Sequence, residues 1–253
     1  DMSVAGLRVL SSATMSLDDP DGSRLTIGSL GIIVDQNAGA FTMAPAVLLG
    51  GTQAWENQGG GTLTLNGNVS NMGFDLAVGG SGRIVFSGTL DGTGALTKTG
   101  TGSVTLSGAN TYSGDTMVTG GTLNLNSASA LGTGTLILNG GDLDNTTGTE
   151  IVNANDNNQI WSSSFAFNGS SSLNLGDGNV LLQVSSRVNV RGGTLTVGGI
   201  ISGAYGITKD GPGKLVLRGL NTYTDGTTLL AGTLDVNSST AIGTGSLTIS
   251  DST

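Results

Sequence analysis

The chain has 253 residues, of which 45 are Gly, 9 are Lys or Arg, 18 are Asp or Glu, and none is His or Cys. The missing residue types exclude disulfides, Cys nucleophiles, Ser-His-Asp triads and metal sites built on His or Cys. A net charge of −9 with scattered cations argues against nucleic-acid binding, and no apolar run is long enough for a membrane helix.

Apolar residues recur at alternate positions in short stretches that Gly, Asn, Ser and Thr separate. A period of two places the apolar side chains of one stretch on a single face, as in a β-strand, and the polar residues between stretches are typical of turns. Residues 44–49 and 128–131 could each form a single helical turn. In chain order, the predicted strands include residues 25–27, 63–65, 104–106, 123–125, 136–138, 195–197, 215–217 and 247–249.

The chain contains an internal repeat with an offset of 111 residues. Residues 95–138 and 206–249 align without a gap and are identical at 20 of 44 positions. Lys98 matches Lys209, and residues 110–112 match residues 221–223. The periodicity predicts a single continuous segment over residues 1–253, with a partial repeat at 1–30, one unit at 31–141 and a second at 142–252.

Many short strands fit a sandwich, an up-and-down barrel or a solenoid. The steps from Leu106 to Leu123 and from Leu123 to Leu136 are 17 and 13 residues, which is irregular, as in a solenoid with turns of variable length. We therefore expect an all-β fold, namely a right-handed parallel β-helix (solenoid) built from repeats of about 111 residues. Each coil would take about 20–25 residues.

Glycines recur at matched positions of the two repeats, where we expect the corners of coils. Corners need residues that accept a positive φ, and Gly does so without steric cost. The matched pairs are Gly100/Gly211, Gly102/Gly213, Gly108/Gly219, Gly121/Gly232 and Gly132/Gly243.

The densest acidic cluster is Asp18, Asp19 and Asp21, beside Pro20 and Gly22. Three carboxylates around a turn could hold Ca²⁺, which prefers oxygen ligands. The alternative is an acidic turn in contact with solvent. No EF-hand pattern or nonapeptide calcium repeat supports the metal, so the question stays open.

A second acidic stretch contains Asp142, Asp144 and Glu150 and runs into an Asn-rich segment at 153–158. On a β-helix this stretch could protrude as a loop, and paired carboxylates can carry out acid/base chemistry on glycosidic bonds. Arg187 and Arg191 are the nearest cations in the sequence. A polar loop without catalysis is the favoured interpretation.

The repeated side chains favour structural roles. Asn110 and Tyr112, with their matches Asn221 and Tyr223, suggest a corner at which Asn bonds to backbone and Tyr covers an apolar edge while its hydroxyl reaches water. The remaining side chains have a structural and a chemical interpretation each. Trp55 and Trp161 are packing anchors or sugar-stacking surfaces. Lys98 and Lys209 are expected to neutralise an acidic or carbonyl-rich turn rather than to act as nucleophiles. Gly79–Gly82 lacks the Lys-Ser/Thr of a phosphate loop.

Residues 94–123 and 205–234 resemble the autotransporter-associated β-strand repeat, also called the passenger-associated transport repeat. The shared pattern includes the Lys, the Gly-x-Gly, the Asn-Thr-Tyr and the final Gly-x-Leu. The second copy departs by Tyr205 in place of Gly and by the order Asp225-Gly226. The resemblance implies a β-helical passenger segment of a large bacterial surface protein that is exported by type V secretion. It brings no catalytic residue.

We accordingly expect a non-catalytic structural or adhesive stalk segment, located outside the cell or on its surface, with any export signal outside this sequence. No catalytic, cofactor-binding or metal-ligating residue is assigned. Expected partners are a host-surface or glycan ligand and further copies of the segment joined end to end into fibres. Neither nucleic acid nor membrane insertion is expected. The alternatives are a carbohydrate-binding or carbohydrate-degrading β-helix and a calcium-stabilised module.

Overall fold

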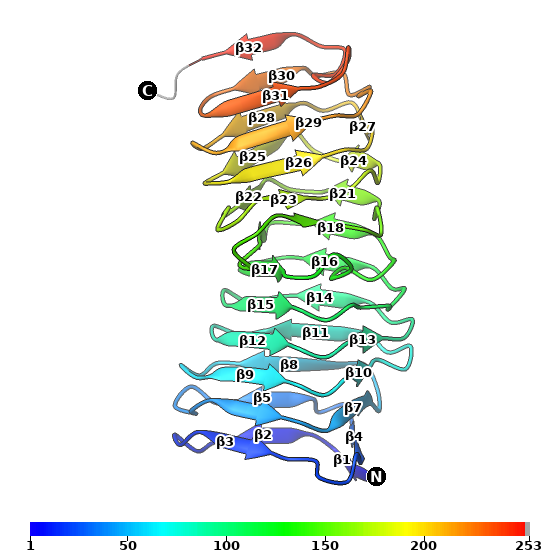
Figure 1. Cartoon of the computed structure of the whole chain (residues 1–253), viewed down its shortest axis with the longest axis vertical. Coiled ribbons are helices and arrows are strands. Elements are labelled where there is room, and N and C mark those ends of the chain that lie inside the picture. The colour runs from blue at the N-terminus through cyan, green and yellow to red at the C-terminus, as the bar shows by residue number, and fades with distance from the viewer. Residues whose placement is uncertain (251–253) are drawn as a thin grey trace. The chain divides into compact units, whose positions relative to one another are not determined.

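The computed structural model describes residues 1–250, and every regular element in this range is a β-strand (Figure 1). No helix in that range could cross a membrane. The chain divides into two compact units, Asp1–Gly134 and Thr135–Thr253. In each unit the strands form stacks of parallel neighbours, so each unit is a parallel β-solenoid. This confirms the expected architecture, whereas the handedness and the 111-residue repeat boundaries stay predictions.

Unit 1 has three stacks of strands. The first contains β1 (Met2–Val4), β4 (Arg24–Ile27), β7 (Ala46–Leu49), β10 (Val69–Ser70) and β13 (Leu90–Asp91). The second contains β2 (Leu7–Val9), β5 (Ile32–Val34), β8 (Gln53–Asn57), β11 (Leu76–Gly79), β14 (Leu96–Lys98) and β16 (Thr116–Val118). The third contains β3 (Met15–Leu17), β6 (Phe41–Met43), β9 (Thr62–Leu65), β12 (Arg83–Phe86), β15 (Ser103–Leu106) and β17 (Thr122–Leu125).

Unit 2 also has three stacks. One contains β18 (Leu136–Leu138), β21 (Gln159–Trp161), β24 (Val180–Leu182) and β27 (Ile201–Ser202). Another contains β19 (Asp142–Asp144), β22 (Phe165–Phe167), β25 (Ser186–Val190), β28 (Ile207–Asp210), β30 (Thr227–Leu229) and β32 (Leu247–Ile249). The last contains β20 (Ile151–Val152), β23 (Leu173–Asn174), β26 (Thr194–Val197), β29 (Lys214–Leu217) and β31 (Thr233–Val236).

The core of each unit consists of columns of apolar side chains from successive turns. In the third stack of unit 1 the register aligns Phe41, Leu63, Ile84, Val104 and Leu123, all buried. Consecutive members of this column are 22, 21, 20 and 19 residues apart. Each turn therefore buries its apolar face on the turns before and after it, which is how a solenoid gains stability.

All of the strands that the alternation of apolar residues predicts are present, but one predicted helical turn is wrong. Residues 46–49 form β7, which pairs in parallel with β4 and β10. Val47 and Leu49 point into the core, so the strand satisfies both the backbone and the apolar side chains. The other segment, 128–131, is a hydrogen-bonded turn in which Ala130 N donates to Ser127 O at 3.1 Å.

Glycine has two distinct uses at the corners. Gly100 has a φ of 65°, as predicted for a corner residue. Gly108 is required for a different reason: a Cβ at this position would lie 2.2 Å from the carbonyl oxygen of Gly88 in the preceding turn. A Cβ at Gly88 would likewise lie 2.4 Å from the carbonyl oxygen of Gly67, one turn earlier. The turns therefore touch backbone to backbone along this column.

Replacing Gly108 with Ala is expected to lower the stability of the segment by about 1–3 kcal/mol, because the new methyl group meets a backbone oxygen that cannot move aside. Gly60→Ala is the matched control, since a Cβ there has no atom within 4 Å. Thermal unfolding followed by circular dichroism measures both. Equal melting temperatures for the two variants would contradict the backbone contact.

Candidate functional site

The two matched segments contain the same buried polar cluster. Between β15 and β16 the chain forms no strand, and Asn110 and Tyr112 lie in this gap. The Asn110 side chain accepts a hydrogen bond from Leu90 N at 2.8 Å and donates one to Ala130 O at 2.7 Å. A side-chain amide thus takes the place of a peptide group between the turn below and the turn above.

The second copy repeats this arrangement. Asn221 accepts from Ile201 N at 2.7 Å and donates to Ala241 O at 2.6 Å, between β29 and β30. Tyr223 and its match Tyr112 are fully buried. The prediction that the Asn bonds to the backbone is confirmed.

The prediction that the Tyr hydroxyls reach water is wrong. The Tyr112 hydroxyl lies 2.6 Å from Thr116 Oγ1, and the Tyr223 hydroxyl lies 2.5 Å from Thr227 Oγ1. Burial raises the pKa of both phenols. Because a buried Thr four residues later supplies the hydrogen bond, the whole aromatic ring can enter the core.

Lys98 and Lys209 are fully buried, and their ammonium groups bind backbone carbonyls. Lys98 Nζ donates to the oxygens of Thr99 at 2.5 Å, Gly100 at 3.3 Å and Gly120 at 3.0 Å. The three donors of an ammonium group are therefore all used. Two acceptors belong to the corner that follows the Lys and the third to the next turn, so the side chain ties two turns together.

Lys209 makes the equivalent contacts. Its Nζ donates to the oxygens of Asp210 at 2.8 Å, Gly211 at 2.7 Å and Ala231 at 3.0 Å. Burial lowers the pKa of both lysines to about 8, and the nearby Asp210 carboxylate partly opposes this for Lys209. The prediction that these lysines neutralise carbonyl-rich turns is confirmed.

The tryptophans are core residues. Trp55 stacks on Phe86 with ring centres 5.7 Å apart, and Trp161 packs edge-on against Phe165 at 5.0 Å. Both are fully buried, which confirms the packing role and overturns the sugar-stacking alternative. Each indole nitrogen donates to the Gln two residues earlier; Gln159 Nε2, however, is buried without a partner among residues 1–250.

Only part of the acidic stretch lies in the loop that was expected: Glu150 and residues 153–158 are outside the strands, whereas the two aspartates are not. Asp142 and Asp144 belong to β19, where the parallel ladder fixes their positions. Asp142 pairs with Arg191 at 2.8 Å, and Asp144 is buried and accepts two hydrogen bonds from Ser170.

Other predicted residues also have local partners. Arg187 pairs with Asp210 at 2.6 Å, and the Asn153 side chain donates to Asn157 at 2.9 Å. In the first acidic cluster, Asp19 accepts from Ser23 N at 2.7 Å. Across residues 1–250, no three carboxylates are grouped so that they could hold a metal ion.

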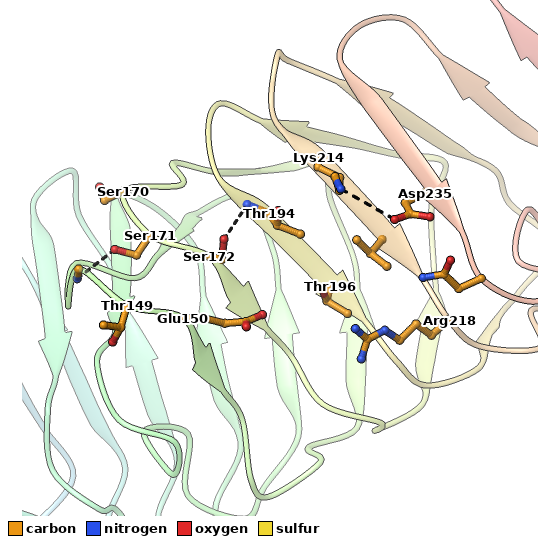
Figure 2. Close-up of a pocket in the computed structure, with 13 residues that line it drawn as sticks. Thr149, Glu150, Ser170, Ser171, Ser172, Thr194, Thr196, Lys214, Arg218 and Asp235 are labelled. Carbon is orange, nitrogen blue, oxygen red and sulfur yellow. Dashed lines mark hydrogen bonds and ion pairs between the residues drawn. The ribbon is translucent and has the colours of Figure 1, made fainter.

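An open groove of about 500 Å³ is lined by residues of β26, β29 and β31 and of the segments that precede β20 and β23 (Figure 2). Thr196 and Val216 lie on its floor, and their side chains are only 2% and 5% exposed. Lys214, Arg218 and Asp235 line one end, and Glu150 lies toward the other.

No motif in the sequence predicts this groove. The available signal was the comparison of the two copies at outward-facing positions, where Ser103, Ser107 and Asn124 of the first become Lys214, Arg218 and Asp235 of the second.

Replacing Lys98 with Met removes the ammonium group and leaves three carbonyls without their donor. We expect a loss of about 2–3 kcal/mol in the free energy of unfolding. The control is Lys214→Met, because the Lys214 side chain is 45% exposed and lies 4.0 Å from Asp235, a contact worth about 0–1 kcal/mol. Denaturant unfolding of the two variants measures the difference. A larger loss of unfolding free energy for Lys214→Met would contradict the stabilising role of the Lys98 hydrogen bonds.

The Lys98 pKa of about 8 predicts a particular pH dependence. An unfolded Lys has a pKa of about 10.4, so between pH 8 and 10 the unfolded chain binds more protons than the folded chain. Stability from this group therefore rises with pH in that window. The melting-temperature difference between the wild type and Lys98→Met should widen from pH 8 to 10. A narrowing would contradict the lowered pKa of Lys98.

A family model of the passenger-associated transport repeat matches residues 96–125 and 207–236, which include both clusters. An adhesin from Brucella suis biovar 1 (strain 1330), the "Adhesin BmaC autotransporter", is 41% identical over 56 residues, which is 22% of this chain and 2% of the adhesin. No solved structure matches the chain. The chain thus carries two copies of the passenger-associated transport repeat.

Proposed function

We propose that the chain is a non-catalytic stalk segment in the passenger of an autotransporter-like bacterial surface protein. The observation that carries this proposal is the pair of transport-repeat matches, each of which coincides with a buried cluster that joins successive turns of a parallel solenoid. The matched part of the chain corresponds to only 2% of the Brucella adhesin, so the activity of any whole protein is itself a proposal.

The physical role of the repeats is to add turns to a growing solenoid. Each new turn packs on unpaired backbone hydrogen-bonding groups and on a column of apolar side chains. In the repeats it also accepts a hydrogen bond from an Asn side chain of the preceding turn. A chain that crosses a membrane in extended form can fold by adding turns to those already in place, since each turn contacts only its neighbours.

The segment is proposed to function outside the cell, either displayed at the surface or secreted. The similarity to a protein named as an adhesin supports a display role, with a host-surface molecule as the expected partner. Isolated segments are also proposed to associate end to end, because an uncovered terminal turn offers unpaired strand edges.

A surface-display assay tests the proposal. The chain is fused between a signal peptide and the translocator of an autotransporter that is exported efficiently in a Gram-negative host. Intact cells are then treated with protease. We expect the wild-type segment to reach the surface and yield a protease-resistant fragment. Gly108→Val with Gly219→Val should reduce that fragment several-fold, because both side chains would meet backbone carbonyls at about 2 Å.

Gly60→Ala serves as the control and should behave like the wild type. Retention of the wild-type segment inside the cell, or an unchanged fragment in the doubly substituted variant, would count against a folding stalk.

A further inference from the structure

The two repeat copies differ most where their side chains face solvent. Inward-facing positions keep their apolar character: Val104 matches Leu215, Leu106 matches Leu217, and both members of each pair are buried. On the outward side, Ser103 becomes Lys214 and Ser107 becomes Arg218. The scaffold is therefore constant, and the second copy adds Lys214, Arg218 and Asp235 to a groove that Glu150 lines from an earlier segment.

The groove offers hydrogen-bonding groups that the protein itself leaves free. The side chains of Arg218 and Glu150 line the groove and make no hydrogen bond or ion pair with any of residues 1–250, and neither belongs to a regular strand (Figure 2). Lys214 and Asp235 are 4.0 Å apart, a loose pair that an inserted hydroxyl could bridge. The groove thus presents donors and acceptors together.

The walls between these charges carry hydroxyl groups. Ser172, just before β23, accepts a hydrogen bond from Thr194 N on β26 at 3.2 Å, and Thr196 lies on the floor. The four charged side chains cancel, which gives the groove no net charge. Its volume of about 500 Å³ falls in the usual range for small-ligand sites, roughly 300–1,000 Å³.

We propose that this groove binds an uncharged oligosaccharide, with Arg218 and Glu150 as its main hydrogen-bonding residues. A sugar hydroxyl both donates and accepts, so a chain of hydroxyls can satisfy a guanidinium group and a carboxylate at the same time. The balance of charge disfavours an acidic polymer. No aromatic ring lines the groove, so affinity comes from polar contacts and is modest for one site.

This inference stands apart from the stalk proposal, because a stalk can fold and reach the surface without binding any ligand. Arg218→Ser should therefore leave surface display and melting temperature unchanged, since the first copy carries Ser107 at the matched position of the same scaffold. A binding failure and a display failure are thus distinguishable.

The test is binding of the purified chain to an array of linear neutral oligosaccharides, namely glucose, mannose and N-acetylglucosamine oligomers, followed by NMR titration of the best binder. We expect Arg218→Ser and Glu150→Gln each to weaken binding at least 10-fold. Arg83→Ser, which removes an exposed Arg from β12 outside the groove, is the matched control and should change binding less than 2-fold.

Three results would overturn the proposal. The first is the absence of binding to every neutral oligomer at millimolar concentration. The second is binding that Arg218→Ser and Glu150→Gln do not weaken. The third is preference for acidic polysaccharides or for a protein ligand at the same groove, which would assign it to a different partner.

Discussion

The structure depends on the hydrogen-bonded contact between one turn and the next. Every described strand pair is parallel, and each turn supplies both the template and the cover for its neighbours. Where the strand is interrupted, Asn110 and Asn221 maintain the contact through their side chains, and Lys98 and Lys209 bind the carbonyls of adjacent corners. Apolar columns then fill the interior that these contacts define.

Buried polar residues are costly unless each donor and acceptor has a partner. In the repeats this condition is met by local geometry: three carbonyls surround each ammonium group, and a Thr hydroxyl faces each Tyr. These hydrogen bonds therefore fix the register between successive turns. Apolar side chains alone could pack in several registers, whereas each hydrogen bond forms in only one.

Much of the fold could be predicted from the sequence, because a period of two defines strands and the recurrence of Lys98 at Lys209 defines a repeat. The same local pattern could not reveal contacts between turns. Val47 and Leu49 lie in a strand that pairs with β4 and β10, one turn before and one turn after it. The Asn110 side chain likewise bonds to Leu90 and Ala130, each 20 residues away. The groove could not be predicted from local pattern because stacking of turns brings Glu150 to the same face as Lys214 and Arg218, more than 60 residues later.

The backbone contact of Gly67, Gly88 and Gly108 has a consequence for how a new turn is accepted. If an incoming turn were displaced by one residue, Ser107 or Ala109 would face the carbonyl column in place of Gly108, and its Cβ would have no room. A turn displaced in this way could not approach its predecessor as closely as Gly108 approaches Gly88. The glycine column therefore favours one alignment of the turns that it spans, independently of the apolar core.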